Sequence, residues 1–264
     1  MYWLRLSCGR EAADQLAGRL WELGTTGIRE LDFDDKAVLI AHFEATEACA
    51  DWISEFREYT PEWGQEENID WTARTKAAWP TREVGQRLFL AAPWTSDATP
   101  LGRERVIHNP GGACGTGEHP CSQLALQALE KCVSPKSRVV DIGTGSGLLA
   151  IAALLLGAQS AFGFDPDEEA LATARGNFAL NTLNPQLIVG SAECLANGCA
   201  DVTVANINAT VLLSILDDLM RITREGGWLI LTGFTEAELR PFRDMFPDAE
   251  VSGIDEWRCI TLRV

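Results

Sequence analysis

The feature that most restricts how this chain can fold is an apolar segment that runs directly into three alternate glycines, Val139-Val140-Asp141-Ile142-Gly143-Thr144-Gly145-Ser146-Gly147. The apolar residues before the glycines are typical of a buried strand, and those after them continue as a helix. Glycine lets the backbone turn tightly and lets a ligand lie close against it. This segment therefore predicts an α/β domain with a cofactor site at the turn.

Strand and helix patterns alternate regularly from residue 134 onward. Apolar runs predict strands over residues 138–142, 160–165, 187–190, 202–207 and 228–232. The periodicity predicts helices over residues 147–156, 167–181, 210–222 and 235–246. This alternation indicates a parallel sheet covered on both faces. Two last strands without a helix between them, near 251–254 and 259–264, favour the seven-stranded Rossmann-like arrangement of methyltransferases over the all-parallel dinucleotide one.

The N-terminal part shows a different order of elements. Strands are predicted over residues 2–8, 28–33, 37–43 and 68–75, and helices over residues 10–23 and 46–59. This order is that of a ferredoxin-like α+β module. We expect residues 1–76 to form a recognition domain, with a purely structural appendage as the alternative. Residues 77–110, which hold four prolines, predict a connector with extra strands, and residues 111–264 predict the cofactor domain.

The charge balance is strongly acidic, with a formal net charge of −16 and a pI of about 4.6. Such a chain has no long-range attraction for nucleic acid, and no basic stripe interrupts it. The charge could attract a basic protein or a cationic cofactor, although acidity for solubility alone is an equal explanation.

The hydropathy pattern gives no reason to expect membrane association. No apolar run approaches the roughly 20 residues that span a bilayer. The first residues lack the basic segment and apolar core of a signal peptide. We therefore expect a cytoplasmic location.

The eight cysteines are scattered and include no Cys-x-x-Cys pair. Several lie in apolar stretches, where a reduced cysteine behaves as a small hydrophobic residue. The one local cluster, Cys114, His119 and Cys121, offers at most three ligands without paired zinc spacing. The sequence therefore predicts no metal site.

Two acidic residues make the glycine segment more specific. Asp141 lies two residues before Gly143, where many methyltransferases carry an acid near the amino-acid end of S-adenosylmethionine. Asp165 ends the next predicted strand, where a carboxylate can accept hydrogen bonds from both ribose hydroxyls. Capping of the following helix is an alternative for Asp165, and both roles can hold. With Gly145 and Gly147, these residues predict an S-adenosylmethionine site, with NAD as the competing cofactor.

Two further segments carry a resemblance to a known family, Pro110-Gly111-Gly112-Ala113-Cys114-Gly115-Thr116-Gly117-Glu118-His119-Pro120-Cys121-Ser122 and Val204-Ala205-Asn206-Ile207-Asn208. Together with the glycine segment, they resemble the bacterial enzymes that methylate the large-subunit ribosomal protein numbered eleven. The resemblance implies cofactor contacts from Ser122, Gly143, Asp165 and Asn206. It also implies that the N-terminal ferredoxin-like domain grips the ribosomal protein.

The chain departs from the family pattern at four positions near the site. A hydroxyl pair of the family is Cys121-Ser122 here, and an aromatic residue is Cys114. An acid is replaced by Asn109, and a small apolar residue by Asn208. These departures leave the cofactor expectation intact and bear on the substrate.

Asn206, at the end of a predicted strand, is the candidate catalytic residue. Only a neutral amine can attack a methyl group, yet a free lysine has a pKa of about 10.4. Burial disfavours the ammonium form, and an orienting group can hold the amine in line. We expect the side-chain carbonyl of Asn206 to accept from the amine; capping of the strand end is the alternative. His119 is a second candidate for acid–base work, although its loop is more typical of a turn.

These observations predict an S-adenosylmethionine-dependent N-methyltransferase that releases S-adenosylhomocysteine. Through the resemblance, the expected acceptors are lysine side chains, and as a further acceptor the N-terminal amine, of a large-subunit ribosomal protein. Three alternatives stay open. They are a methyltransferase of the same fold acting on another protein or a small amine, a non-catalytic module that binds a ribosomal protein, and an NAD oxidoreductase.

Overall fold

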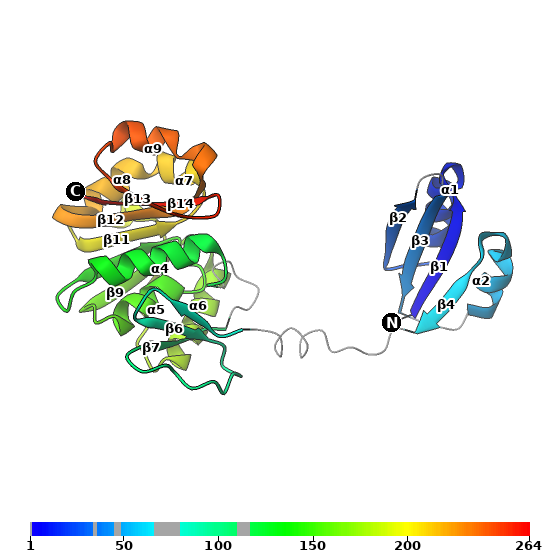
Figure 1. Ribbon diagram of the computed structural model, residues 1–264, viewed down its shortest axis with the longest axis horizontal. Coiled ribbons are helices and arrows are strands. Elements are labelled where there is room, and N and C mark those ends of the chain that lie inside the picture. Colours follow the sequence, from blue (N-terminus) through cyan, green and yellow to red (C-terminus); the bar gives the residue numbers. More distant parts are fainter. Residues whose placement is uncertain (1, 34–35, 45–48, 66–79, 110–116) are drawn as a thin grey trace. The chain divides into compact units, whose positions relative to one another are not determined.

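The computed structural model describes residues 2–33, 36–44, 49–65, 80–109 and 117–264. The chain divides into two compact units, Met1–Ala78 and Trp79–Val264, whose elements are labelled in Figure 1. Each unit has a sheet and a hydrophobic core of its own.

The described part of the first unit is an antiparallel sheet with two helices. Its elements are β1 (Tyr2–Gly9), α1 (Arg10–Glu22), β2 (Gly27–Phe33), β3 (Lys36–Phe43), α2 (Cys49–Glu55), a 3-10 turn (Arg57–Tyr59) and β4 (Glu62–Gln65). The strands lie in the order β2-β3-β1-β4. The strand predicted over 68–75 lies outside the described residues, and the fourth strand seen in this sheet is β4.

Apolar side chains on one face of α1 and on the sheet form the core of this unit. Leu16 and Leu20, one turn apart on α1, are buried together with Leu6 and Leu39 of the sheet. The helix is followed by Gly24, whose φ of +85° favours glycine and ends the helical path. The helix predicted over 10–23 therefore ends within one residue of its predicted position.

In the residues that the structure describes, the main sheet of the second unit has seven strands in the order β10-β9-β8-β11-β12-β14-β13. They are β8 (Arg138–Ile142), β9 (Ser160–Asp165), β10 (Leu187–Val189), β11 (Ala200–Asn206), β12 (Thr223–Thr235), β13 (Glu250–Ile254) and β14 (Trp257–Arg263). The strands from β10 to β12 in this order run parallel, whereas β14 runs antiparallel to both β12 and β13. The last two strands thus form the predicted hairpin.

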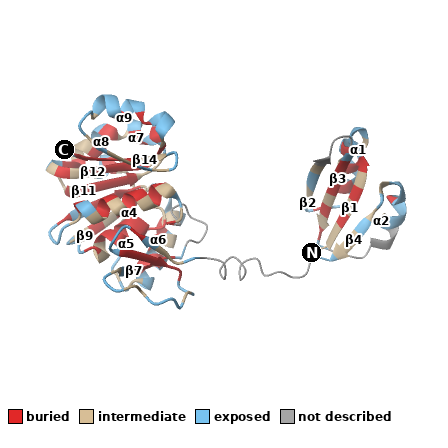
Figure 2. Ribbon diagram, viewed as in Figure 1, coloured by how far each residue is buried: buried red, intermediate tan, exposed pale blue. Residues whose placement is uncertain are grey.

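Helices cover both faces of this sheet, namely α4 (Pro120–Cys132), α5 (Leu148–Leu155), α6 (Glu168–Leu180), α7 (Ala209–Ser214), α8 (Leu216–Ile222) and α9 (Arg240–Met245). Adjacent strand residues face opposite cores, because Val139 packs with α4 and α5 while Val140 packs with α7 and α8. Figure 2 shows the buried residues concentrated in the strands between these layers. The sequence analysis did not predict α4. No helix within the described ranges is both long and apolar enough to cross a membrane.

Residues 80–109 contribute a smaller sheet to the same unit. Within the described residues its strands are β5 (Arg82–Val84), β6 (Leu88–Ala91) and β7 (Glu104–Ile107), in that order. Val84, Leu88 and Val106 are buried in the same hydrophobic core as α4 and α5. The strands expected between residues 77 and 110 thus complete the core of the domain that follows them.

Two predicted helices are interrupted in the structure. The helix predicted over 210–222 is α7 followed by α8, with the break at Ile215 (φ −113°, ψ 10°). Ser214 turns its hydroxyl back to the carbonyl of Val211 at 2.7 Å, which competes with helical hydrogen bonding. The helix predicted over 235–246 is a 3-10 turn and then α9, because Pro241 lacks the N–H that a continuous helix needs.

Candidate active site

The predicted site residues gather at one edge of the main sheet. Strands β9, β8 and β11 are parallel neighbours, so their carboxyl ends lie at the same edge. Asp165 ends β9, Asn206 ends β11, and Gly143 directly follows β8 between them. The fold therefore brings together the groups that the sequence analysis selected from three separate segments.

The glycine loop, residues 143–147, connects β8 to α5. Gly143, Gly145 and Gly147 have φ values of +71°, +51° and +81°, all in the left-handed region that favours glycine. A Cβ atom added to Gly143 would lie 2.5 Å from Cγ2 of Ile207, and one added to Gly147 would lie 3.1 Å from Cβ of Ala174. The backbone conformation thus favours glycine at all three positions, and the close packing reinforces this at the first and third.

The carboxyl group of Asp141 lies beneath the glycine loop and is fully buried. Its Oδ2 accepts hydrogen bonds from the Thr144 hydroxyl at 2.7 Å and from the Ala150 backbone nitrogen at 3.2 Å. Burial raises the pKa of this carboxyl to about 7, against the lowering effect of the two hydrogen bonds. Among the described groups, Oδ1 has no hydrogen-bond partner. Asp141 therefore anchors the loop and keeps one unpartnered oxygen.

Asp165 binds the glycine loop from the neighbouring strand. Its Oδ2 accepts from the backbone nitrogen of Gly145 at 2.9 Å, and its Oδ1 accepts from that of Asp167 at 3.0 Å. Asp167 in turn caps α6 by accepting from the backbone nitrogen of Glu169 at 2.9 Å. A carboxylate has about four acceptor positions, so two bonds leave room for ligand hydroxyls.

Ser122 and Asn206 meet although they lie 84 residues apart in the chain. Ser122 is buried near the start of α4, and Asn206 ends β11. Nδ2 of Asn206 donates to Oγ of Ser122 at 3.4 Å. The two residues selected through the family resemblance are thus neighbours at the same sheet edge as the glycine loop.

Two other polar residues near this edge cap helices. Nδ1 of His119 accepts from the backbone nitrogen of Cys121 at 3.3 Å, and the His119 ring meets that of Trp257 edge to face at 4.4 Å between centroids. Oδ1 of Asn208 accepts from the backbone nitrogen of Val211 at 3.0 Å. Through these contacts, His119 caps the N-terminus of α4 and Asn208 caps that of α7. The polar residue at position 208 is therefore accounted for by helix capping.

His108, which directly follows β7 and is buried, was not predicted to belong to the site. Its Nε2 lies 2.9 Å from Oγ of Ser146 in the glycine loop. Burial lowers the pKa of this imidazole to about 4, so the ring is neutral near pH 7. Nothing in the local sequence predicts a contact with a loop 38 residues away.

Asn177 of α6 and Asn181, which caps the end of that helix, bind the end of β7 and the residues that follow it. Asn181 accepts from the backbone nitrogen of Ile107 at 2.9 Å and donates to its carbonyl at 2.7 Å. Asn177 accepts from the backbone nitrogen of Asn109 at 2.8 Å and donates to its carbonyl at 3.2 Å. Asn177 also donates to the carbonyl of Ser146 at 2.9 Å. Their four-residue spacing, which places both on one helix face, is the signal that the sequence carries.

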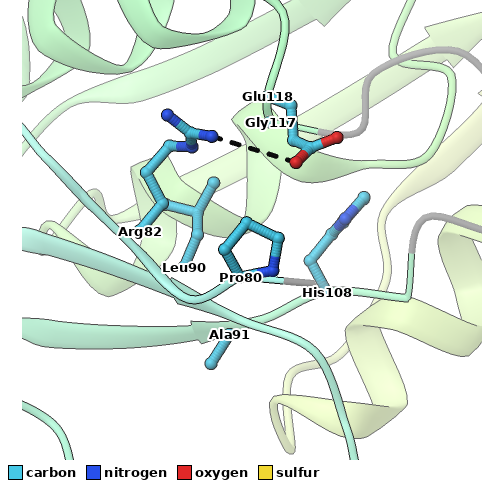
Figure 3. A pocket seen from close by; sticks show the side chains of 7 residues that line it. All are labelled: Pro80, Arg82, Leu90, Ala91, His108, Gly117 and Glu118. Carbon is cyan, nitrogen blue, oxygen red and sulfur yellow. Dashed lines mark ion pairs between the residues drawn. The ribbon is translucent and has the colours of Figure 1, made fainter. Parts of the chain in front are cut away.

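A small pocket lies beside His108, as Figure 3 shows; its lining residues are Pro80, Arg82, Leu90, Ala91, His108, Gly117 and Glu118. Arg82 and Glu118 form an ion pair at 3.8 Å. Over the residues that the structure describes, no three His, Cys, Asp or Glu side chains are grouped so as to hold a metal ion. Cys114 of the cluster considered above lies outside those residues.

A largely parallel sheet that ends in an antiparallel hairpin, with a glycine loop and polar residues at the strand ends, defines an α/β protein of the methyltransferase type. The family model described as ribosomal protein L11 methyltransferase (PrmA) matches residues 2–264. The chain therefore belongs to the ribosomal protein L11 methyltransferase family, and the resemblance noted in the sequence is confirmed.

Individual relatives agree with this assignment. The ribosomal protein L11 methyltransferase of Streptococcus equi subsp. zooepidemicus is 36% identical over 172 residues, which are 64% of this chain and 54% of that protein. The protein of that name from Symbiobacterium thermophilum is 36% identical over 187 residues, 71% of this chain and 61% of that protein. The chain thus spans less than two-thirds of the length of these curated relatives. A crystal structure of ribosomal protein L11 methylase from Lactobacillus delbrueckii subsp. bulgaricus matches with a TM-score of 0.63 at 28% identity, covering 70% of this chain and 99% of that one.

Proposed function

We propose that this protein transfers methyl groups from S-adenosylmethionine to amino groups of a large-subunit ribosomal protein and releases S-adenosylhomocysteine. The acceptors are lysine side chains, with the N-terminal amine as a further acceptor. Membership of the family supports this function. Its main structural support is that Asp165 bonds the glycine loop and Asn206 bonds Ser122 at the same edge of the sheet.

Two carboxyl groups fit the cofactor. Asp165 retains acceptor positions for ribose hydroxyls after its two backbone hydrogen bonds. Asp141 places an acidic group with an unpartnered oxygen beneath the loop. Because a nearby cation stabilises a carboxylate, a cationic ligand at this loop and an ionised Asp141 favour one another. Both groups therefore suit a ligand that carries a ribose and positive charge.

The backbone and the strand ends supply the remaining cofactor contacts. Gly143, Gly145 and Gly147 have no side chain, so a ligand can lie directly against the loop. Ser122 and Asn206 place a hydroxyl and an amide at the same edge. These five residues, with Asp141 and Asp165, are the cofactor-binding residues that we propose.

Asn206 is the residue that we propose for catalysis. The bound cofactor would supply an electrophilic methyl group on a sulfonium centre. Near neutral pH a lysine must lose a proton before it can attack, at a cost of about 4 kcal/mol. Because Nδ2 of Asn206 donates to Ser122, its Oδ1 can accept from the amine and stabilise the positive charge that develops on nitrogen. Asn206 thereby orients the amine and lowers the barrier.

The units divide recognition from chemistry in this proposal. Residues 1–76 form a ferredoxin-like domain that recognises the ribosomal protein, residues 77–110 join it to the rest, and residues 111–264 bind the cofactor. The chain order of the elements and the strand order β2-β3-β1-β4 support the ferredoxin-like assignment. The net charge of −16 suits a basic protein partner.

The test is to incubate the protein with S-adenosylmethionine and unmodified ribosomal protein L11 and to record the intact mass of the target. We expect mass gains in whole methyl units. Asn206→Ala should lower the rate by about 100-fold, the effect of losing one group that stabilises transition-state charge. Asn208→Ala is the matched control, because it removes an amide two residues away that caps α7.

Two outcomes would contradict the proposal. Full activity of Asn206→Ala with cofactor binding intact would remove Asn206 from catalysis. No mass gain with the wild-type protein, when calorimetry shows that the cofactor binds, would exclude this substrate. The protein would then be a methyltransferase for another acceptor or a module that binds without turnover.

A further inference from the structure

The glycine loop is held at Ser146 from two sides. The Ser146 side chain lies 2.9 Å from Nε2 of His108, and its backbone carbonyl accepts from Asn177 at 2.9 Å. Asn177 also bonds both backbone groups of Asn109, the residue next to His108. Strand β7, helix α6 and the loop are therefore joined in a closed ring of hydrogen bonds.

This ring lies one residue from a proposed cofactor contact. Gly145 directly precedes Ser146, and its backbone nitrogen donates to Oδ2 of Asp165. Gly145 and Gly147, on either side of Ser146, have no side chain with which to fix their backbone. The position of Ser146 consequently determines where the loop amide meets Asp165.

Burying a polar side chain at position 108 costs free energy. The His108 ring is 3% exposed, and Leu90 and Ala91 line the same pocket. A buried polar group costs free energy unless it is hydrogen-bonded, and an apolar side chain would avoid that cost. The contact with Ser146 satisfies Nε2 of the ring, and it links the ring to the glycine loop.

We propose that His108 is a positioning residue that raises the affinity of the glycine loop for its cofactor by holding Ser146. The inference rests on the proposed function, since S-adenosylmethionine and its product are the ligands concerned. A loop fixed before binding loses less conformational entropy when the ligand arrives, so affinity increases. Part of the cofactor affinity therefore originates in the residue that follows β7, outside the segment that carries the glycines.

The experiment measures the Kd of S-adenosylhomocysteine for the full-length protein by calorimetry. His108→Leu fills the space without the hydrogen bond and should weaken binding by about tenfold, corresponding to about 1.4 kcal/mol. His108→Gln can still reach Ser146 with a polar atom and should stay within about threefold of wild type. Ser146→Ala should also weaken binding, because it removes the same bond, and the double variant should lose no more than Ser146→Ala alone.

A matched control separates positioning from general stability. The hydroxyls of Thr223 and Thr203 are buried and 2.7 Å apart, and Thr223 begins β12 at the end of the sheet opposite to Asn206. Thr223→Val should remove a buried hydrogen bond, as His108→Leu does, without changing the Kd. Urea unfolding of each variant establishes that the comparison is made on folded protein.

Each outcome decides the inference. A tenfold loss in His108→Leu, with rescue by His108→Gln and an unchanged Kd in Thr223→Val, would support it. A wild-type Kd in His108→Leu, or an equal loss in Thr223→Val, would overturn it and leave the proposed function standing. Failure of the wild-type protein to bind S-adenosylhomocysteine or S-adenosylmethionine would overturn both.

Discussion

The two units differ in what they bury. Of the described residues in the first unit, the buried polar side chain is that of Thr25, whereas the second unit buries polar side chains throughout, including His108, Asp141, Ser146 and Asn177. Burying a polar group costs free energy unless it is paired. The second unit bears this cost where the glycine loop must be held, whereas the first is held together by apolar contacts. This difference agrees with the proposed function, in which the second unit carries the chemistry and the first recognises the partner through its surface.

The core of the first unit is small and largely aliphatic. Leu4, Leu6 and Leu39 are fully buried in it, and Phe43 packs against Trp52 with 4.5 Å between ring centroids. A domain of about this size buries only about 60% of its unfolded surface, so its stability is marginal. Each buried leucine is therefore a large share of its stability.

The largest expected effect comes from Leu39→Ala. Removing this fully buried side chain should cost the first unit about 4 kcal/mol. We expect urea unfolding, followed by tryptophan fluorescence, to show an early transition. Methylation of the ribosomal protein should fall, while the Kd of S-adenosylhomocysteine stays within about twofold of wild type. Loss of cofactor binding in this variant would show that the units are not separable in function.

A pH-dependent difference should appear in the second unit. The pKa of His108 is about 4 in the folded protein against 6.5 for an ordinary histidine, because burial disfavours the charged ring. Between these values the unfolded state binds the proton that the folded state excludes, so stability falls as the pH falls from about 6.5 to about 4. The loss should reach about 3 kcal/mol. Wild type and His108→Leu should therefore diverge in urea unfolding over this range.

Wild type must be compared with His108→Leu because Asp141 and His108 change the stability in opposite directions as the pH changes. The pKa of Asp141 is raised to about 7 by burial, against an ordinary 3.8, so its contribution weakens as the pH rises through the same range. The two effects offset each other in wild type. A wild-type curve parallel to that of His108→Leu would show that the buried imidazole does not titrate as expected.

Asp165→Asn should weaken cofactor binding by the second unit. The change keeps the size of the side chain but removes the charge that strengthens its hydrogen bonds, and should weaken S-adenosylhomocysteine about 30-fold, about 2 kcal/mol. Asp167→Asn is the control, because asparagine caps a helix as well as aspartate does. Calorimetry on both variants measures the difference. Equal affinities for the two would place the cofactor elsewhere.

Removing an exposed ion pair should have the smallest effect on the free energy of unfolding, and the effect should be similar in both units. Arg19 and Glu22 form an exposed ion pair in the first unit, and Lys131 and Glu250 form one in the second. Such pairs are screened by water, so Glu22→Gln and Glu250→Gln should each change the free energy of unfolding by less than about 0.5 kcal/mol. A larger change in either, measured by urea unfolding, would mean that surface charge also distinguishes the units.

Local pattern was enough to predict the parts of the site that lie along one segment. The strand, the glycine loop and the following helix come from residues 138–156, and Asp165 ends the next strand as its apolar run predicts. The break at Ile215 was not predicted, because apolar periodicity continues through it. The bond from His108 to Ser146 depends on tertiary contacts that place the residues after β7 beside the glycine loop, which a single sequence does not specify. Family resemblance, and not periodicity, selected Ser122 as a cofactor contact, and its contact with Asn206 is seen only in the structure.

Strand β7 is the outer strand of its small sheet within the described residues, and an outer strand usually exposes unpaired backbone groups. Here Asn177 and Asn181 each offer one donor and one acceptor to Asn109 and Ile107, as a further strand would. One helical turn, about 5.4 Å, is close to the rise of two strand residues, about 6.6 Å, so two side chains suffice. These two amides, of which that of Asn177 also holds the loop, thus close this stretch of the edge to pairing with another chain and protect the molecule from aggregation there.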